Sequence, residues 1–255
     1  MPYYVILILV LAILGILIWK RDSKNHLAVI GIAFIVGISI FSLFFWQSRQ
    51  PTTSLRVVGY ASKLFESDLV KWSVSFQKSV GTNELSQGYR GMSDDLKAFQ
   101  KHLVQQGIPD DDQSVMPVTS YTRHDNNGNM IGYTLNQSIT IISEDLEKIG
   151  ELSLNADFFA ERGMVLNNSN LEYLYTKLPE LKQQLLAEAT EDALARAGEI
   201  SGSAKTKLGK MQEARAGVFQ ITEPYSTDVS DYGIYNTSTR KKSISVTMTA
   251  VFKLK

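Results

Sequence analysis

Two long runs without a charged residue, near the start of the chain, most constrain what this sequence can fold into. They cover residues 3–19 and 27–46. A helix rises about 1.5 Å per residue and the hydrocarbon core of a bilayer is about 30 Å thick, so the second run spans a membrane and the first is just long enough. Tyr3, Trp19 and Trp46 lie at the ends of the runs, where aromatic side chains favour the headgroup region. We therefore predict a transmembrane helical hairpin within residues 1–50.

Two other readings of these runs are a cleaved signal peptide and a buried core helix. A signal peptide begins with basic residues and ends at a small-residue cleavage site. The first run lacks both features, since no basic side chain precedes it and it ends in Trp19. The hairpin is therefore the preferred interpretation.

The short connection between the runs, "KRDSKNH", predicts the orientation of the hairpin. It carries Lys20, Arg21 and Lys24 against the single acidic residue Asp22. Basic residues next to membrane helices stay in the cytoplasm, so this turn is expected inside and residues 51–255 outside. Three basic residues follow the second run, namely Arg49, Arg56 and Lys63. They weigh against this orientation, although they are more thinly spread than those of the connection.

Charge and cysteine content limit the chemistry of the remaining chain. Of 26 basic and 26 acidic residues, the connection holds three and one, which leaves the rest slightly acidic. Such a balance lacks the basic footprint of a nucleic-acid-binding protein, so no nucleic-acid partner is expected. The chain has no cysteine, which excludes disulfides, thiolate metal sites and a thiol nucleophile.

Hydrophobic periodicity in residues 51–255 predicts strands and helices in alternation. The segment 69–77 alternates apolar and polar residues, as does the last strand, 243–254, which is either an edge strand or a strand paired on both sides. Apolar residues at spacings of three and four predict a helix over 85–103. Another helix, 178–200, carries an alanine every four residues at Ala189, Ala193 and Ala197, which would let it lie close on a sheet. Further elements are expected as strands at 55–61, 164–168, 171–175 and 208–221, a hairpin around Asn127-Gly128, and a helix from Ser143 to about residue 156. This pattern favours an α+β fold with a mainly antiparallel sheet.

A search for catalytic or ligand-binding motifs gives no catalytic, cofactor-binding or metal-ligating residue to assign. The three histidines, His26, His102 and His124, are far apart in sequence. The segment around Gly209-Lys210 resembles a phosphate loop but lacks its first glycine. The acidic runs 110–112 and 125–129 are incomplete as calcium loops, and solvated turns are the simpler interpretation.

Several segments together resemble the SIMPL-domain family of bacterial envelope proteins. They are "RVVGYASKLFESDLVKWSVSF", "LVQQGIPDDDQSV", "IGYTLNQSITI", the alanine-bearing helix followed by "KLGKMQEA", "AGVFQIT" and "SISVTMTAVFKL". The family usually has Pro-Asp where this chain has Ser67-Asp68, and its members more often carry a signal peptide or a single anchor helix. The resemblance implies an α+β extracytoplasmic domain over about 55–254, a tendency to form homo-oligomers, and links to envelope and oxidative stress. It implies no catalytic residue.

The sequence thus favours a membrane-anchored, non-enzymatic protein of the inner membrane, with a SIMPL-like domain over 51–255 that self-associates as a scaffold or binding module. Two alternatives stay open. One is a pore or transport component, which would require a ring of subunits, since neither apolar run carries a charge. The other is an enzyme whose residues converge only in the folded protein; a deep pocket with shifted pKa values would favour it. No cofactor is expected.

Overall fold

The computed structural model describes residue 16, residues 26–48 and residues 53–255. The chain divides into two compact units, residues 1–54 and residues 55–255. In the first unit, α2 (His26–Ser48) covers the second predicted membrane span. Its segment Ile30–Ser48 is long and apolar enough to cross a membrane, and Phe34, Phe41 and Phe44 on it are exposed. The first predicted span, 3–19, lies outside the described residues except for Ile16, so one apolar helix is shown and a two-helix hairpin is not.

The second unit contains two five-stranded sheets, where the sequence predicted one mainly antiparallel sheet. The first sheet contains β1 (Ser54–Glu66), β7 (Leu208–Ala216), β8 (Gln220–Thr222), β9 (Ile234–Tyr235) and β10 (Lys241–Leu254). The second sheet contains β2 (Leu69–Val80), β3 (Gln113–Val115), β4 (Thr119–His124), β5 (Met130–Ser143) and β6 (Val165–Leu174). The α+β class and the antiparallel pairing are confirmed; β8 and β9 are a parallel pair.

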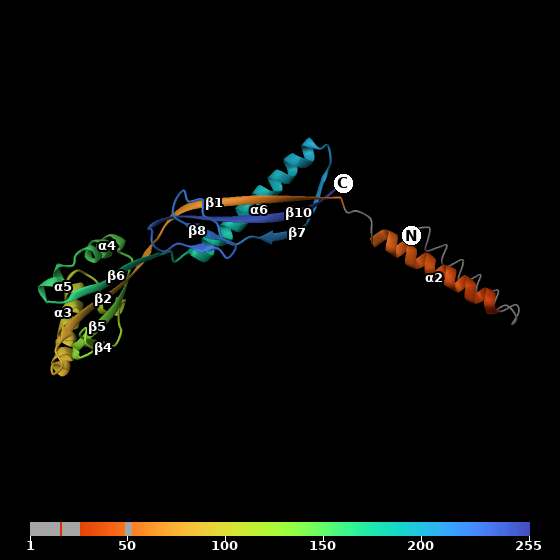
Figure 1. Ribbon diagram of the computed structural model, residues 1–255. Helices are drawn as coiled ribbons and strands as arrows, with labels where there is room; N and C mark the ends of the chain where they lie inside the picture. The colour runs from red at the N-terminus through yellow and green to blue at the C-terminus, as the bar shows by residue number, and fades with distance from the viewer. Residues whose placement is uncertain (1–15, 17–25, 49–52) are drawn as a thin grey trace. The chain divides into compact units, whose positions relative to one another are not determined.

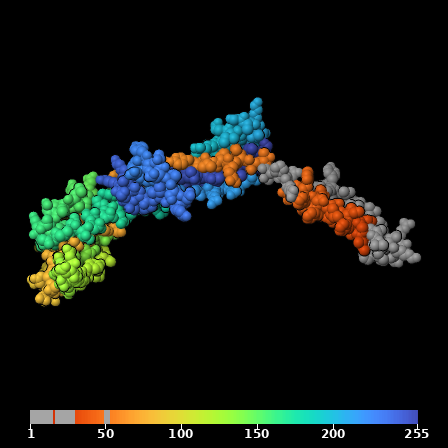
Figure 2. Space-filling view, viewed as in Figure 1, coloured from red at the N-terminus to blue at the C-terminus, as the bar shows by residue number. Residues whose placement is uncertain are grey.

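In the first sheet the strand order is β1-β10-β8-β9, and β7 also pairs with β10. The last strand is therefore paired on both sides, and the edge-strand reading of residues 243–254 is wrong. Its inward row is buried because α6 (Leu178–Ser203) lies on that face. The alanine prediction is confirmed, since Ala189, Ala193 and Ala197 are fully buried. Figure 1 shows α6 along this sheet, and Figure 2 shows the orange β1 beside dark blue C-terminal residues.

In the second sheet the strand order is β3-β5-β2-β6, and β4 pairs with β5. Three helices, α3 (Leu85–Gln105), α4 (Leu146–Leu154) and α5 (Asp157–Glu161), contact its strands. The central strand β2 buries Val70, Trp72, Val74 and Phe76 against them, in the alternation that the sequence predicted. These side chains and the inward residues of α3 make up a large apolar core.

Several local predictions differ from the structure. The hairpin between β4 and β5 forms, but only Gly128 has a positive φ. Asp145, not Ser143, is the N-cap of α4, because its side chain accepts the N–H of Lys148. The two strands expected at 164–168 and 171–175 are one strand, β6. The strand expected at 208–221 is interrupted at Gly217, so β7 and β8 are separate.

The two sheets meet where the chain passes from one to the other. Ser67 and Asp68 alone separate β1 from β2, and the two strands belong to different sheets. The N–H of Ser67 donates to the carbonyl of Arg240 at 2.9 Å, and the N–H of Asp68 donates to that of Leu174 at 3.1 Å. The ammonium of the buried Lys242 donates to the carbonyl of Tyr173. Backbone and side-chain hydrogen bonds thus join the sheets at this point.

Candidate functional site

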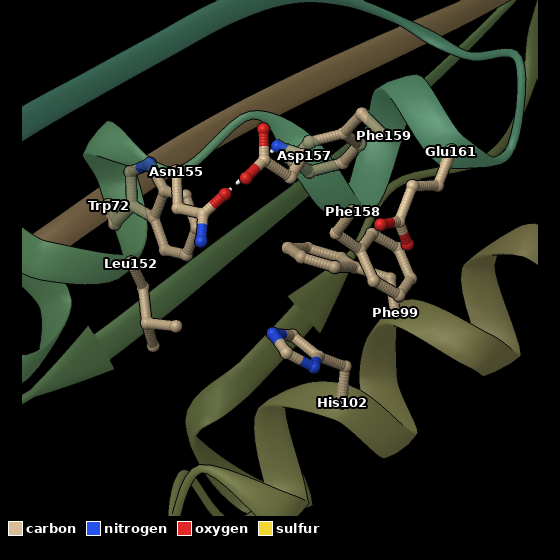
Figure 3. A pocket seen from close by; sticks show the side chains of 9 residues that line it. All are labelled: Trp72, Phe99, His102, Leu152, Asn155, Asp157, Phe158, Phe159 and Glu161. Carbon is tan, nitrogen blue, oxygen red and sulfur yellow. Dashed lines mark hydrogen bonds between the residues drawn. The ribbon is translucent and has the colours of Figure 1, made fainter.

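A cavity of about 360 Å³ lies between the helices of the second sheet. Four elements and the α4–α5 connection line it: β2, α3, α4 and α5. Its lining residues are Trp72, Phe99, His102, Leu152, Asn155, Asp157, Phe158, Phe159 and Glu161. Figure 3 shows His102 rising from α3 beside Phe158, with Leu152 on the other side of the opening. The cavity joins an aromatic interior to a polar rim.

The aromatic interior is a cluster of rings in edge-on and tilted contact. The ring of Phe99 lies 6.1 Å from that of Trp72, 5.3 Å from Phe158 and 5.0 Å from Phe159. Trp72, Phe99 and Phe159 are almost fully buried, whereas Phe158 is half-buried. The indole N–H of Trp72 donates to the hydroxyl of Ser169 at 2.9 Å. Offset and edge-on packing of this kind stabilises an aromatic core and holds the cavity walls in place.

The ring of Phe158 also contacts two cationic or ionisable groups. The imidazole of His102 stacks on it at a centroid distance of 5.0 Å and an angle of 24°. The guanidinium carbon of Arg162 lies 5.0 Å from the same centroid. Cations are attracted to the negative face of an aromatic ring. Phe158 therefore already serves as a cation-binding surface within the protein.

Local sequence explains how the rim is built. The side chain of Asn155 accepts the N–H of Asp157 at 2.9 Å, which forms the turn that starts α5. One helical turn separates Asp157 from Glu161, so α5 directs both carboxylates toward the same side. Both residues are exposed, and no ion pair of either is found in the described part of the chain. The rim is therefore acidic.

Sequence reasoning predicted none of this cavity. The predicted strand at 69–77 contains Trp72 and the predicted helix at 85–103 contains Phe99, but no element was predicted at α5. The signal that was available is "NADFFAERG" (155–163), in which an Asn capping residue precedes two phenylalanines between two acids. A helix of five residues has too little periodicity to be recognised, which is why the site was missed.

The other residues that the sequence singled out lie elsewhere. Within the described ranges, no group of three His, Asp or Glu side chains is placed to hold a metal ion. Asp110–Asp112 form a 3-10 turn. The carboxylate of Asp125 accepts the N–H of Asn127 at 2.9 Å and that of Asn129 at 2.8 Å, so it orders the hairpin loop. The side-chain and backbone hydrogen bonds from Asn129 lower the pKa of Asp125.

A second titratable group with a changed pKa is Lys242, which is 2% exposed on β10. Burial lowers its pKa, because the ammonium loses water. Neither Lys242 nor Asp125 lines the aromatic cavity. The two groups with shifted pKa values and the cavity therefore lie in different places.

The fold defines a class of protein: an α+β domain of two sheets that follows a helix long and apolar enough to cross a membrane. The family model SIMPL, described as a protein of unknown function (DUF541), matches residues 55–252. The chain belongs to the SIMPL family, as the sequence resemblance predicted. No curated protein matches the chain.

Proposed function

We propose that this protein is a membrane-anchored, non-enzymatic binding protein of the cell envelope, and that its SIMPL domain takes a small ligand in the aromatic cavity. One observation carries the proposal: a hollow of about 360 Å³ that combines aromatic walls with an unpaired acidic rim. Small-molecule sites are concave, mostly apolar, and carry a few polar groups that orient the ligand. The apolar helix α2 supports the anchorage.

The chemistry of the cavity favours a small cation with an apolar body. Asp157 and Glu161 supply negative charge at the opening, and four aromatic rings line the walls. A ligand cation would compete with Arg162 and His102 for the ring of Phe158. A cation over an aromatic ring is stabilised by about 0.5–1 kcal/mol at an exposed site. An anionic ligand would face two carboxylates instead.

Binding is the better proposal than catalysis for this cavity. A nucleophile or general base needs a hydrogen-bonded partner that orients it. Among the hydrogen bonds of the described residues, none joins the side chain of His102 to that of Asp157 or Glu161, and no serine lines the cavity. The ionisable groups present are those that attract and orient a ligand.

The test uses three probes of similar size that differ in charge: benzyltrimethylammonium, benzyl alcohol and benzoate. Each is titrated against the full chain in detergent, and binding is measured by ligand-observed NMR. We expect the cation to bind most tightly. The double variant Asp157→Asn, Glu161→Gln should weaken its binding by about threefold to tenfold, the equivalent of two weak charge contacts.

The matched control for this experiment is Asp110→Asn, Asp111→Asn, which removes the same charge from the 3-10 turn. It should leave the affinity for the cation unchanged. Equal binding of the three probes, or equal loss in both double variants, would show that the cavity is not a cation site.

A second proposed property is self-association through β1, and the sheet order favours it. β1 lies at the end of the first sheet, so one side of this strand has no strand beside it in the described chain. Val58, Tyr60 and Leu64 on it are exposed. An open strand edge with apolar side chains pairs readily with another chain. Sedimentation of the detergent-extracted protein measures this directly, and a mass of one subunit would contradict it.

A further inference from the structure

Four exposed lysines gather at one end of the first sheet. They are Lys205, Lys207, Lys253 and Lys255, and we call them the lysine end. Among the ion pairs of the described residues, none involves any of the four. The lysine end is therefore a positive surface without an ion pair in the described part of a chain whose formal net charge is zero.

The fold, not the sequence, brings these lysines together. Lys207 and Lys255 exchange two backbone hydrogen bonds, at 3.2 and 2.9 Å, so they lie directly opposite each other. Gly209 packs so closely on Lys253 that an added Cβ would lie 2.6 Å from its carbonyl oxygen. Lys205 follows the end of α6 with a φ of 54°. Lysine ammonium groups gathered at one end of a sheet repel one another unless an anion is near.

Local structure accounts for only part of this cluster. Cations near the C-terminus of a helix interact favourably with its dipole, which gives Lys205 and Lys207 a structural role at the end of α6. Lys253 is on β10 and Lys255 follows it directly. The dipole of α6 therefore does not account for these two lysines. The carboxylates nearest in sequence are Glu199 on α6 and Glu213 on β7. Glu213 shares a separate hollow of about 260 Å³ with Arg56 and Arg215.

The start of β1 lies at this same end of the sheet. Leu55 and Leu208 both pack against the core cluster that contains Phe252, and Figure 1 shows the C-terminus beside the start of β1. α2 ends at Ser48 and β1 begins at Ser54. Six residues of chain span at most about 22 Å in any conformation. The chain connection between α2 and the lysine end is therefore short.

We propose that the lysine end binds the phosphates of anionic lipid headgroups in the membrane that α2 crosses. This inference rests on the proposed anchorage by α2. Lysine is a compact positive charge suited to phosphate, and clusters of basic residues next to a membrane helix are attracted to anionic lipid surfaces. Contact at the lysine end would add a second attachment to the membrane and so restrict how the domain stands on it.

The test reconstitutes the full chain in vesicles of phosphatidylcholine alone or with 30% phosphatidylglycerol. Because the chain has no cysteine, Ser203→Cys gives a single labelling site beside the lysine end. Energy transfer from this label to an acceptor lipid measures docking, and flotation with vesicles measures anchorage. We expect the same flotation in both vesicles, but higher energy transfer with the anionic lipid and a decline as salt rises, because salt screens exposed charges.

The decisive variant replaces all four lysines of the lysine end with glutamine. Each lysine at an anionic surface is worth a factor of about five in the docking equilibrium, so the variant should lose on the order of a hundredfold or more. The matched control replaces Lys97, Lys101, Lys177 and Lys241, four other exposed lysines, and should keep its docking.

The outcomes separate docking from anchorage. Flotation with both vesicles and equal energy transfer would overturn the docking proposal while supporting the anchor. Flotation only with anionic vesicles, lost in the variant, would support docking and overturn the anchor. Flotation with neither would overturn both.

Discussion

At Gly59, β1 and α6 come so close that no side chain fits between them. A Cβ added there would lie 2.1 Å from the carbonyl oxygen of Ala189 and 2.5 Å from the backbone nitrogen of Ala193. The alanines of α6 were predicted to allow a close approach to a sheet. That a glycine faces them could not be predicted, because the register of a helix on a strand depends on tertiary packing.

We expect Gly59→Ala to lower the free energy of unfolding by about 1–3 kcal/mol, since the backbone of α6 must move to admit the methyl group. The control is Gly198→Ala on α6, where an added Cβ meets nothing within 4 Å. It should raise stability by up to about 1 kcal/mol, because alanine is the better helix former. Urea unfolding of both variants measures this, and equal effects would contradict the close contact.

Lys242 is a charged residue in the buried row of an alternating strand. It stands two residues before Ile244 in the inward row of β10, so the pattern itself places this charged residue in the interior. Burial holds the pKa of Lys242 below its usual 10.5. Between the folded value and 10.5 the unfolded chain binds more protons than the folded protein, so stability rises with pH in that range.

We therefore expect the native protein to gain stability relative to the Lys242→Met variant as the pH is raised from 7 toward 10.5. Methionine keeps an unbranched side chain but does not titrate. Lys241→Met, at the exposed neighbouring position, should track the native protein at every pH. Denaturant unfolding at pH 7 and pH 10 checks this. A constant difference between the native protein and Lys242→Met would show that Lys242 does not couple stability to pH.

Among the elements, β1 and β10 have positions in the first sheet that the sequence left open. Both alternate, and alternation reports which face of a strand is buried, not whether its edges are paired. In the structure β10 is central and β1 is at the edge of the sheet. Likewise, the short turn at Ser67-Asp68 resembles a hairpin turn, but β1 and β2 enter different sheets. Which distant segments pair depends on how the whole core packs, so it cannot be read from the sequence of either strand alone.

The open side of β1 is identified by its hydrogen bonds. The N–H of Tyr60 donates to the carboxylate of Asp192 on α6, at 2.8 Å, and so points away from β10. Neighbouring residues on a strand direct their N–H groups to opposite sides, so that of Ser62 also points outward. Proline at position 62 would remove a backbone donor from the open edge and no backbone donor from the pairing with β10, but it would also remove the hydroxyl that contacts that of Ser243 on β10 at 3.4 Å.

We expect Ser62→Pro to weaken self-association while the fold is retained. Thr247→Pro, in the middle of β10, serves as the contrasting variant. It interrupts a strand that is paired on both sides, so it should lower the melting temperature by more than Ser62→Pro does. Circular dichroism reports the fold and sedimentation the mass. A folded Ser62→Pro protein with undiminished mass would remove β1 from the interface.

For the whole molecule, the division between an apolar helix and an α+β domain followed from the sequence, because length and charge alone identify a membrane span. The arrangement of that domain as two sheets did not. Its cavity depends on α5, and its lysine end depends on a backbone pairing between Lys207 and Lys255. Both sites join residues that are distant in sequence, so a local pattern such as residues 155–163 can indicate only part of a site.

The side of the membrane on which the domain lies is the prediction that bears most on its partners and ligand. The charges of Lys20, Arg21 and Lys24 favour a cytoplasmic turn, and therefore an extracytoplasmic SIMPL domain. Arg56 and the lysine end act in the opposite sense if they lie close to the membrane, although positive charge within a large folded domain has little influence on orientation.

We expect an alkaline phosphatase fused after Lys255 to be active, and one fused at Ser23 to be inactive. A fluorescent protein that matures only in the cytoplasm, fused at the same two positions, should give the reverse result and so controls for expression. Activity of the phosphatase at Ser23 alone would place the domain in the cytoplasm, and the cavity would then be open to cytoplasmic ligands instead.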